Sequence, residues 1–112
     1  MDVSKRQVGD VTILDLKGKI TIGTGDVQLR NAVQDVMNSG AMKVLINMRD
    51  VSTIDSSGIG ELVSAYTTAT NRGAKLKLIS LPAKVTDILT ITQLITVFDV
   101  YDGEAAGIQS FS

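Results

Sequence analysis

The sequence contains no cysteine and no histidine, and these two absences remove most of the usual catalytic chemistry. Without cysteine the chain can form no disulfide and offers no thiol nucleophile. Without histidine it lacks the commonest general base, so a Ser/His/Asp triad and ordinary zinc sites are excluded. Enzymatic functions therefore lose most of the residues that they would use.

Aromatic residues and excess charge are also scarce. The chain has two tyrosines and two phenylalanines, and its 11 basic and 12 acidic residues give a net charge of −1. A nucleic-acid-binding domain usually carries a basic patch, and a protein that binds anionic membranes usually does too. Direct binding of nucleic acid is therefore not expected, and a protein is the more plausible partner.

No apolar run approaches the ~20 residues that a membrane-spanning helix needs. The segment Met1–Arg6 also lacks the hydrophobic stretch of a signal peptide, so we expect a cytoplasmic protein without membrane insertion. The mean hydropathy of +0.21 fits strands that are covered on both faces, as in parallel sheets. The length of 112 residues suits one domain, 1–112, with its own core.

The order of apolar segments predicts an α/β fold with a mixed β-sheet: an N-terminal hairpin, later parallel strands and about four helices. The hairpin joins Val3–Val8 to Val11–Leu16, and Gly18 is expected to end its second strand, with a short extension over Ile20–Ile22 left open. The other predicted elements are a helix capped by Thr24 or Asp26 and ending before Gly40, a strand over 43–48, a helix from about Ser56 to Gly73, a strand over 75–80, a helix opened by Leu81–Pro82, a strand over 97–101 and a short helix over 103–111.

Two serines and an aspartate stand where the 43–48 strand gives way to a helix. Asp55, Ser56 and Ser57 are residue types that cap the free amides of a helix start, so they could serve only as caps. Gly58 and Gly60 weaken a helix start, however, and are useful where another backbone approaches closely. A phosphate on Ser56 would meet the positive helix end and would also face the Asp55 carboxylate. Such a turn suits a reversible switch.

The same turn carries a resemblance to a known family. The resemblance rests on the runs Leu45–Val51 and Asp55–Gly60 and on the segments VGDVTILDLKGKI, RGAKLKLIS and VFDVY. In their residues and in their order, these segments resemble the STAS-domain anti-sigma-factor antagonists along nearly the whole chain. The resemblance implies a single STAS domain over 1–112 with a STAS-like mixed sheet. Gln93 departs from the family, in which a glycine often ends the third helix, and Asn47 and Thr53 depart from it in the strand and turn before Asp55.

The resemblance implies a partner-switching binder that is not an enzyme, with no catalytic residue, no metal ion and no cofactor of its own. The unphosphorylated antagonist binds an anti-sigma factor that is also a serine kinase and thereby releases the sigma factor. The kinase, which would hold ATP and magnesium, phosphorylates Ser56, the complex separates, and a metal-dependent serine phosphatase resets the switch. Asp55 helps to shape the site. The partner-binding residues expected around it are Ile54, Asp55, Ser56, Ser57, Gly58, Ile59 and Glu61.

Two other functions stay open. The chain could be a STAS scaffold or a transport-associated interaction domain without phosphorylation, in which Asp55 and Ser56 are caps. It could also be a small enzyme or a nucleotide binder that uses Gly58-Ile-Gly60 as a phosphate loop, but the full G-x-G-x-x-G pattern and a Walker lysine are missing. Lys75 and Lys77 are expected to be solvated charges at a strand edge, and Arg49–Asp50 a solvated pair in a loop.

Overall fold

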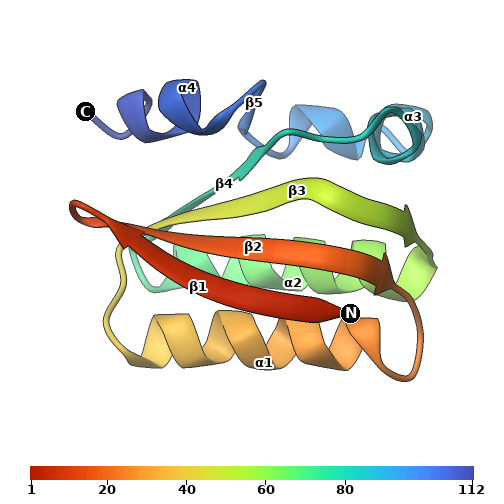
Figure 1. Ribbon diagram of the computed structural model, residues 1–112, viewed down its shortest axis with the longest axis horizontal. Helices are drawn as coiled ribbons and strands as arrows, with labels where there is room; N and C mark the ends of the chain where they lie inside the picture. The colour runs from red at the N-terminus through yellow and green to blue at the C-terminus, as the bar shows by residue number, and fades with distance from the viewer.

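A five-stranded mixed sheet forms the centre of the computed structural model, which describes residues 1–112 (Figure 1). The strands lie in the order β1-β2-β3-β4-β5, and only the first pair is antiparallel. The hairpin turns at Gly9, whose φ of 59° suits glycine. The predicted hairpin and parallel strands are confirmed. The strands are β1 (Asp2–Val8), β2 (Val11–Ile20), β3 (Lys43–Ile54), β4 (Lys75–Ile79) and β5 (Val100–Tyr101).

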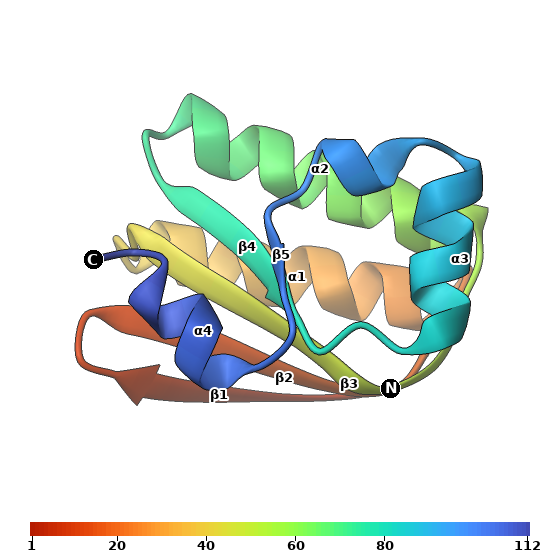
Figure 2. The ribbon, with the colours of Figure 1, turned by 90° about the horizontal axis from the view of Figure 1, so that it is seen from above.

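The helices lie on both faces of this sheet. Helices α1 (Gly25–Asn38) and α2 (Ser56–Asn71) run side by side under one face (Figures 1 and 2). Helix α4 (Glu104–Gln109) packs on the other face, against β3, β4 and β5. Helix α3 (Ala83–Ile91) and a 3-10 turn (Leu94–Thr96) connect β4 to β5. Four α-helices agree with the number expected from the sequence.

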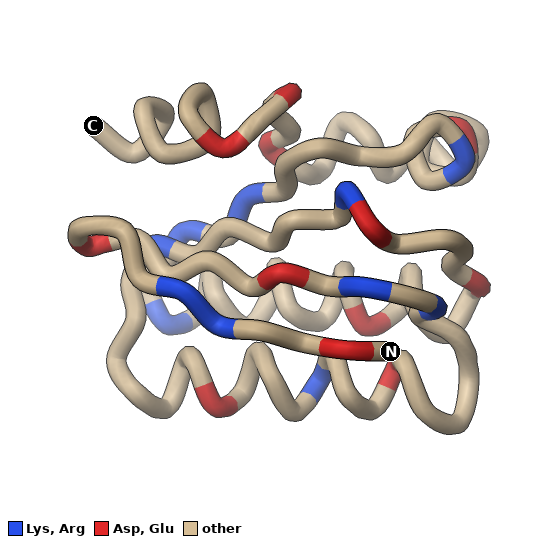
Figure 3. The backbone as a smooth tube through the Cα atoms, viewed as in Figure 1, with Lys and Arg blue, Asp and Glu red and all other residues tan.

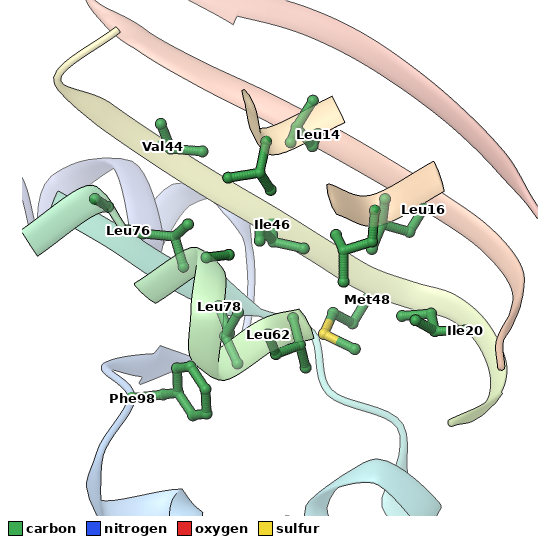
Figure 4. Close-up of a cluster of buried hydrophobic side chains, with 14 of the residues drawn as sticks. Leu14, Leu16, Ile20, Val44, Ile46, Met48, Leu62, Leu76, Leu78 and Phe98 are labelled. Atoms are coloured by element: carbon green, nitrogen blue, oxygen red, sulfur yellow. The ribbon is translucent and has the colours of Figure 1, made fainter. Parts of the chain in front are cut away.

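The main core lies between the sheet and helices α1 and α2 (Figure 4). Leu62 of α2 is fully buried there, and Phe98 closes one end with its ring 5.5 Å from that of Tyr66. Full burial of each such side chain contributes about 1.5–3 kcal/mol relative to exposure. The strand residues that point into this core alternate along β2, β3 and β4: Leu14, Leu16, Val44, Ile46, Met48, Leu76 and Leu78.

The opposite face of the sheet carries a second, smaller core, and it corrects the prediction for Lys77. That side chain is only 6% exposed, because α4 and the chain end cover it. Its Nζ donates to the carbonyl and hydroxyl oxygens of Ser110 at 3.1 and 3.0 Å and lies 4.5 Å from the centre of the Phe111 ring. Lys77 is therefore a buried anchor for α4, whereas Lys75 is exposed as expected.

Two strands are longer than the sequence predicted. Gly18 does not end β2, which continues to Ile20 through two irregular steps in its pairing with β3. Gly18 has a φ of 110°, so it absorbs the irregularity rather than breaking the strand. Arg49 and Asp50 are exposed as expected, but they lie within β3 and not in a loop, since Asp50 pairs with Lys17 of β2.

The last strand is shorter than predicted. Residues 97–101 were expected to be extended, but only Val100 and Tyr101 pair with β4. Phe98 turns into the main core, and the Asp99 carbonyl accepts from the Leu78 amide at 2.9 Å. The apolar pattern of this segment therefore reflects burial of one aromatic ring more than a regular strand.

Candidate functional site

Asp55 is the N-cap of α2 and joins two separate turns of the chain. Its backbone is extended, and its Oδ1 accepts from the Gly58 amide at 3.0 Å. Its Oδ2 accepts from the amide of Ile22, in the loop between β2 and α1, at 2.9 Å. These amide donors, first Gly58 and then Ile22, hold the pKa of Asp55 below its usual value. The N-cap expected from the sequence is confirmed. The bond from the Ile22 amide to the same carboxylate was not predicted.

Gly58 lies where the first turn of α2 touches the end of β2. A Cβ atom there would lie 2.2 Å from the Ile20 carbonyl oxygen and 2.7 Å from the Ile54 Cγ1. The Asp55 amide also donates to that carbonyl, at 3.3 Å. The expectation that another backbone approaches closely is confirmed for Gly58. It is wrong for Gly60, where an added Cβ would meet nothing within 4 Å.

The two serines occupy the first turn of α2 at different depths. Ser56, the first residue of the helix, is exposed, and Ser57 is half-buried. The free amides of a helix start and the helix dipole favour negative charge at this end. A phosphoryl group on the Ser56 hydroxyl would therefore extend into solvent, close to the helix start and to the Asp55 carboxylate.

The remaining predicted contact residues divide into two groups. Ile54 and Ile59 are 4% and 9% exposed, and both pack into the main core under the turn. With Gly58, also buried, they support the turn from below, so their side chains offer a partner little surface. Glu61 reaches the surface between the helices, where its Oε1 accepts from Nη2 of Arg30 of α1 at 2.8 Å.

Sequence reasoning missed two neighbours of the turn. Ile22 is 73% exposed although it is a large aliphatic residue, and its amide is held by Asp55. Arg30 lines a groove of about 230 Å³ between α1 and α2, together with Glu61, Ser64 and Thr68. The order of the strands could have indicated these neighbours. The carboxyl ends of neighbouring parallel strands meet at one edge of a sheet, so the loop between β2 and α1 is expected beside Asp55.

Basic and acidic residues are interspersed along the strands and helices (Figure 3), and a few of them form ion pairs. Arg6 of β1 bridges Asp15 of β2, with Nε to Oδ2 at 2.5 Å, and Glu104 of α4, with Nη2 to Oε1 at 2.6 Å. The Arg6 guanidinium holds the pKa of Asp15 below its usual value. No helix combines the length and apolar character needed to cross a bilayer. The ion pairs of Arg6 with Asp15 and Glu104 tie the hairpin to α4, and all three residues lie outside the Asp55 turn in the sequence.

Comparisons with known proteins agree with the geometry. A family model of the STAS domain matches residues 2–107. The anti-sigma-B factor antagonist of Bacillus subtilis is 28% identical over 105 residues, 94% of each chain. A Thermotoga neapolitana protein assigned as an anti-sigma factor antagonist is 28% identical over 95 residues, 85% of this chain and 84% of the relative.

A solved structure gives the same result for the fold. The crystal structure of a Thermotoga maritima protein, also assigned as an anti-sigma factor antagonist, is similar with a TM-score of 0.89 and 26% sequence identity. The match covers 96% of this chain and 92% of that chain. The chain therefore belongs to the STAS domain family, and its similarity within that family is to the anti-sigma factor antagonists.

Proposed function

We propose that this chain, as one STAS domain over 1–112, is an anti-sigma factor antagonist controlled by phosphorylation of Ser56. In its unphosphorylated form it binds an anti-sigma factor that is also a serine kinase, and the sigma factor is released. The observation that carries the proposal is the exposed Ser56 hydroxyl at the start of α2, beside the Asp55 cap. The similarity to the Bacillus subtilis antagonist, which extends over 94% of each chain, supports it.

The proposed docking surface is built around this turn. Ser56 and Ser57 contribute hydroxyls, and Glu61 contributes a carboxylate that Arg30 holds in place. Ile54, Gly58 and Ile59 act from inside by fixing the shape of the turn. The surface needs no cofactor from this chain, since the kinase supplies ATP and magnesium and a metal-dependent serine phosphatase removes the phosphate.

Phosphorylation can break such a contact with modest energy. A phosphoserine adds about −1.5 to −2 charges at neutral pH, here next to Asp55, whose lowered pKa keeps it ionised. A hundredfold loss of affinity requires about 2.7 kcal/mol. One dianion facing a surface shaped for a neutral hydroxyl can supply that amount, because a charge that is buried at an interface without an opposite partner loses its hydration and gains nothing in return.

The test combines phosphorylation with binding. Purified protein is incubated with a panel of anti-sigma factor kinases, ATP and Mg²⁺, and the modified residue is mapped by mass spectrometry. We expect phosphate on Ser56. With the kinase so identified, Ser56→Ala should bind as tightly as the unphosphorylated wild type and stay bound in ATP, while Ser56→Asp should bind poorly.

Ser57→Ala is the matched control, because Ser57 is the adjacent hydroxyl in the same helical turn. This variant should still accept phosphate and dissociate in ATP. Phosphate on Ser57 instead, or equal affinity of the Ser56→Ala and Ser56→Asp variants, would contradict the proposal.

A further inference from the structure

The Asp55 carboxylate uses its two oxygens for two different segments. Oδ1 caps α2 through the Gly58 amide, and Oδ2 holds the Ile22 amide. Capping alone needs one oxygen, as the good capping ability of serine shows. The second bond is therefore not required for the start of α2. It ties the loop between β2 and α1 to the residue that precedes Ser56.

The tied loop presents an apolar side chain to solvent. Ile22 is 73% exposed. Two carbonyls that precede Ile22 also hold the loop. The Ile20 carbonyl accepts from the Asp55 amide, and the Thr21 carbonyl accepts from the amide of Asp26, which follows Ile22, at 3.1 Å. Gly23, with a φ of 96°, then turns the chain into α1. Because the backbone is already held, binding would have to order only the rotamers of the Ile22 side chain, which lowers the entropy lost on binding.

We propose that Asp55 is a positioning residue that holds Ile22 beside Ser56, and that Ile22 is an apolar contact for the anti-sigma factor. The inference rests on the proposed function and deepens it: the docking surface comprises two turns, from the ends of β2 and β3. The partner must then offer an apolar pocket for a branched aliphatic side chain next to the polar surface that meets the Ser56 hydroxyl.

Asp55→Asn separates the two roles of the carboxylate. Asparagine caps helices about as well as aspartate, so the bond from the Gly58 amide can persist. An amide group has only one acceptor oxygen, so its NH₂ would face the Ile22 amide, donor against donor. The variant should keep its fold by circular dichroism. In the free protein, hydrogen exchange at the Ile22 amide should become faster by about tenfold or more, as expected when a protecting bond is lost.

The binding test is a double-mutant cycle with the kinase identified by the phosphosite assay, measured calorimetrically on unphosphorylated protein without ATP. Ile22→Ala should weaken binding by about tenfold, because it removes most of an apolar contact. Asp55→Asn should also weaken binding. In the Asp55→Asn background, Ile22→Ala should cost no more than about twofold, because its contact is already lost.

Met42→Ala is the matched control. Met42 is also a large exposed apolar residue, at 52%, but it precedes the first residue of β3, whereas Ser56 follows the end of that strand. Its replacement should change affinity by less than about twofold, as expected for a surface site outside the interface.

The outcomes separate the two proposals. If unphosphorylated wild type binds no kinase of the panel, the proposed function fails and the inference falls with it. If wild type binds but Ile22→Ala binds equally well, only the inference is overturned. Independent, additive losses from Ile22→Ala and Asp55→Asn would also overturn it, because Asp55 would then act without positioning Ile22. An unchanged rate of hydrogen exchange at the Ile22 amide in Asp55→Asn would also overturn the inference.

Discussion

Gly58→Ala places a methyl group at the most crowded point of the candidate site. The new Cβ would lie 2.2 Å from the Ile20 carbonyl oxygen, 2.7 Å from Cγ1 of Ile54 and 2.9 Å from Cγ2 of Ile20. The closest of these atoms belongs to the backbone and cannot rotate away. Either α2 moves away from the end of β2 or the strand end shifts, and both movements disturb the bonds that Asp55 makes to the two turns.

Two opposing terms set the size of the effect. Alanine is favoured over glycine in a helix by up to about 1 kcal/mol. Overpacking a well-filled site costs about 1–3 kcal/mol, and contact with a carbonyl oxygen argues for the upper end. We therefore expect Gly58→Ala to lower the free energy of unfolding by about 2 kcal/mol.

Gly60 provides the matched control two residues further along the same helix. An added Cβ there meets nothing within 4 Å, so only the gain in helix propensity remains. Gly60→Ala should raise the free energy of unfolding by up to about 1 kcal/mol. Urea unfolding of both variants, followed by circular dichroism, gives the two values directly. A Gly58→Ala variant as stable as the wild type, or as stable as Gly60→Ala, would refute the close approach.

Two further predictions concern residues outside the turn. Gln93 has a φ of 62°, a left-handed backbone that strains residues other than glycine. Gln93→Gly should therefore raise the free energy of unfolding by about 0.5–1 kcal/mol, measured by thermal melts. An equally large gain in Gln93→Ala would contradict backbone strain as the cause. Asp15, whose pKa is lowered by Arg6, stabilises the fold above the unfolded-state pKa of about 3.9 and loses this contribution as pH falls through the folded-state pKa. In urea titrations the stability difference between wild type and Asp15→Asn should therefore shrink below about pH 4; a constant difference would argue against it.

Most of the architecture could be predicted because its signals are local. The hairpin was visible from Gly9 and its flanking strands, and the helix starting near Ser56 from its 3.6-residue apolar spacing and its capping residues. The left-handed backbone at Gln93 agrees with the family pattern, in which a glycine often ends this helix. Such features are encoded within a few residues, so they do not depend on distant parts of the chain.

The errors arise where distant segments meet. Lys77 alternates with Leu76 and Leu78, which indicates a face without apolar neighbours, but the short helix α4 covers that face and buries the ammonium group. Ile54, two residues before Ser56, belongs to the strand face that points into the main core, so its predicted part in partner binding, acting through the shape of the turn, stays a prediction. In both cases the decisive information is which element packs on which face, and periodicity within one segment does not contain it.

The exposed Ile22 illustrates the same limit for function. Its apolar character in the sequence suggests burial, and only the tertiary structure shows the side chain in solvent with its amide bound to Asp55. The carboxyl ends of adjacent parallel strands do predict that the two turns meet. The partition of the Asp55 oxygens between them depends on backbone geometry and could not be inferred from residue types.

The strand order of the sheet also bears on how the chain is made. Every strand lies beside the strand that precedes it in the sequence, so no pairing has to wait for a segment synthesised much later. The hairpin closes over a two-residue turn, and each parallel addition needs only one crossover unit of about 30 residues. The sheet can thus grow outward from its first hairpin as the nascent chain leaves the ribosome, with β5 and the covering helix α4 added last.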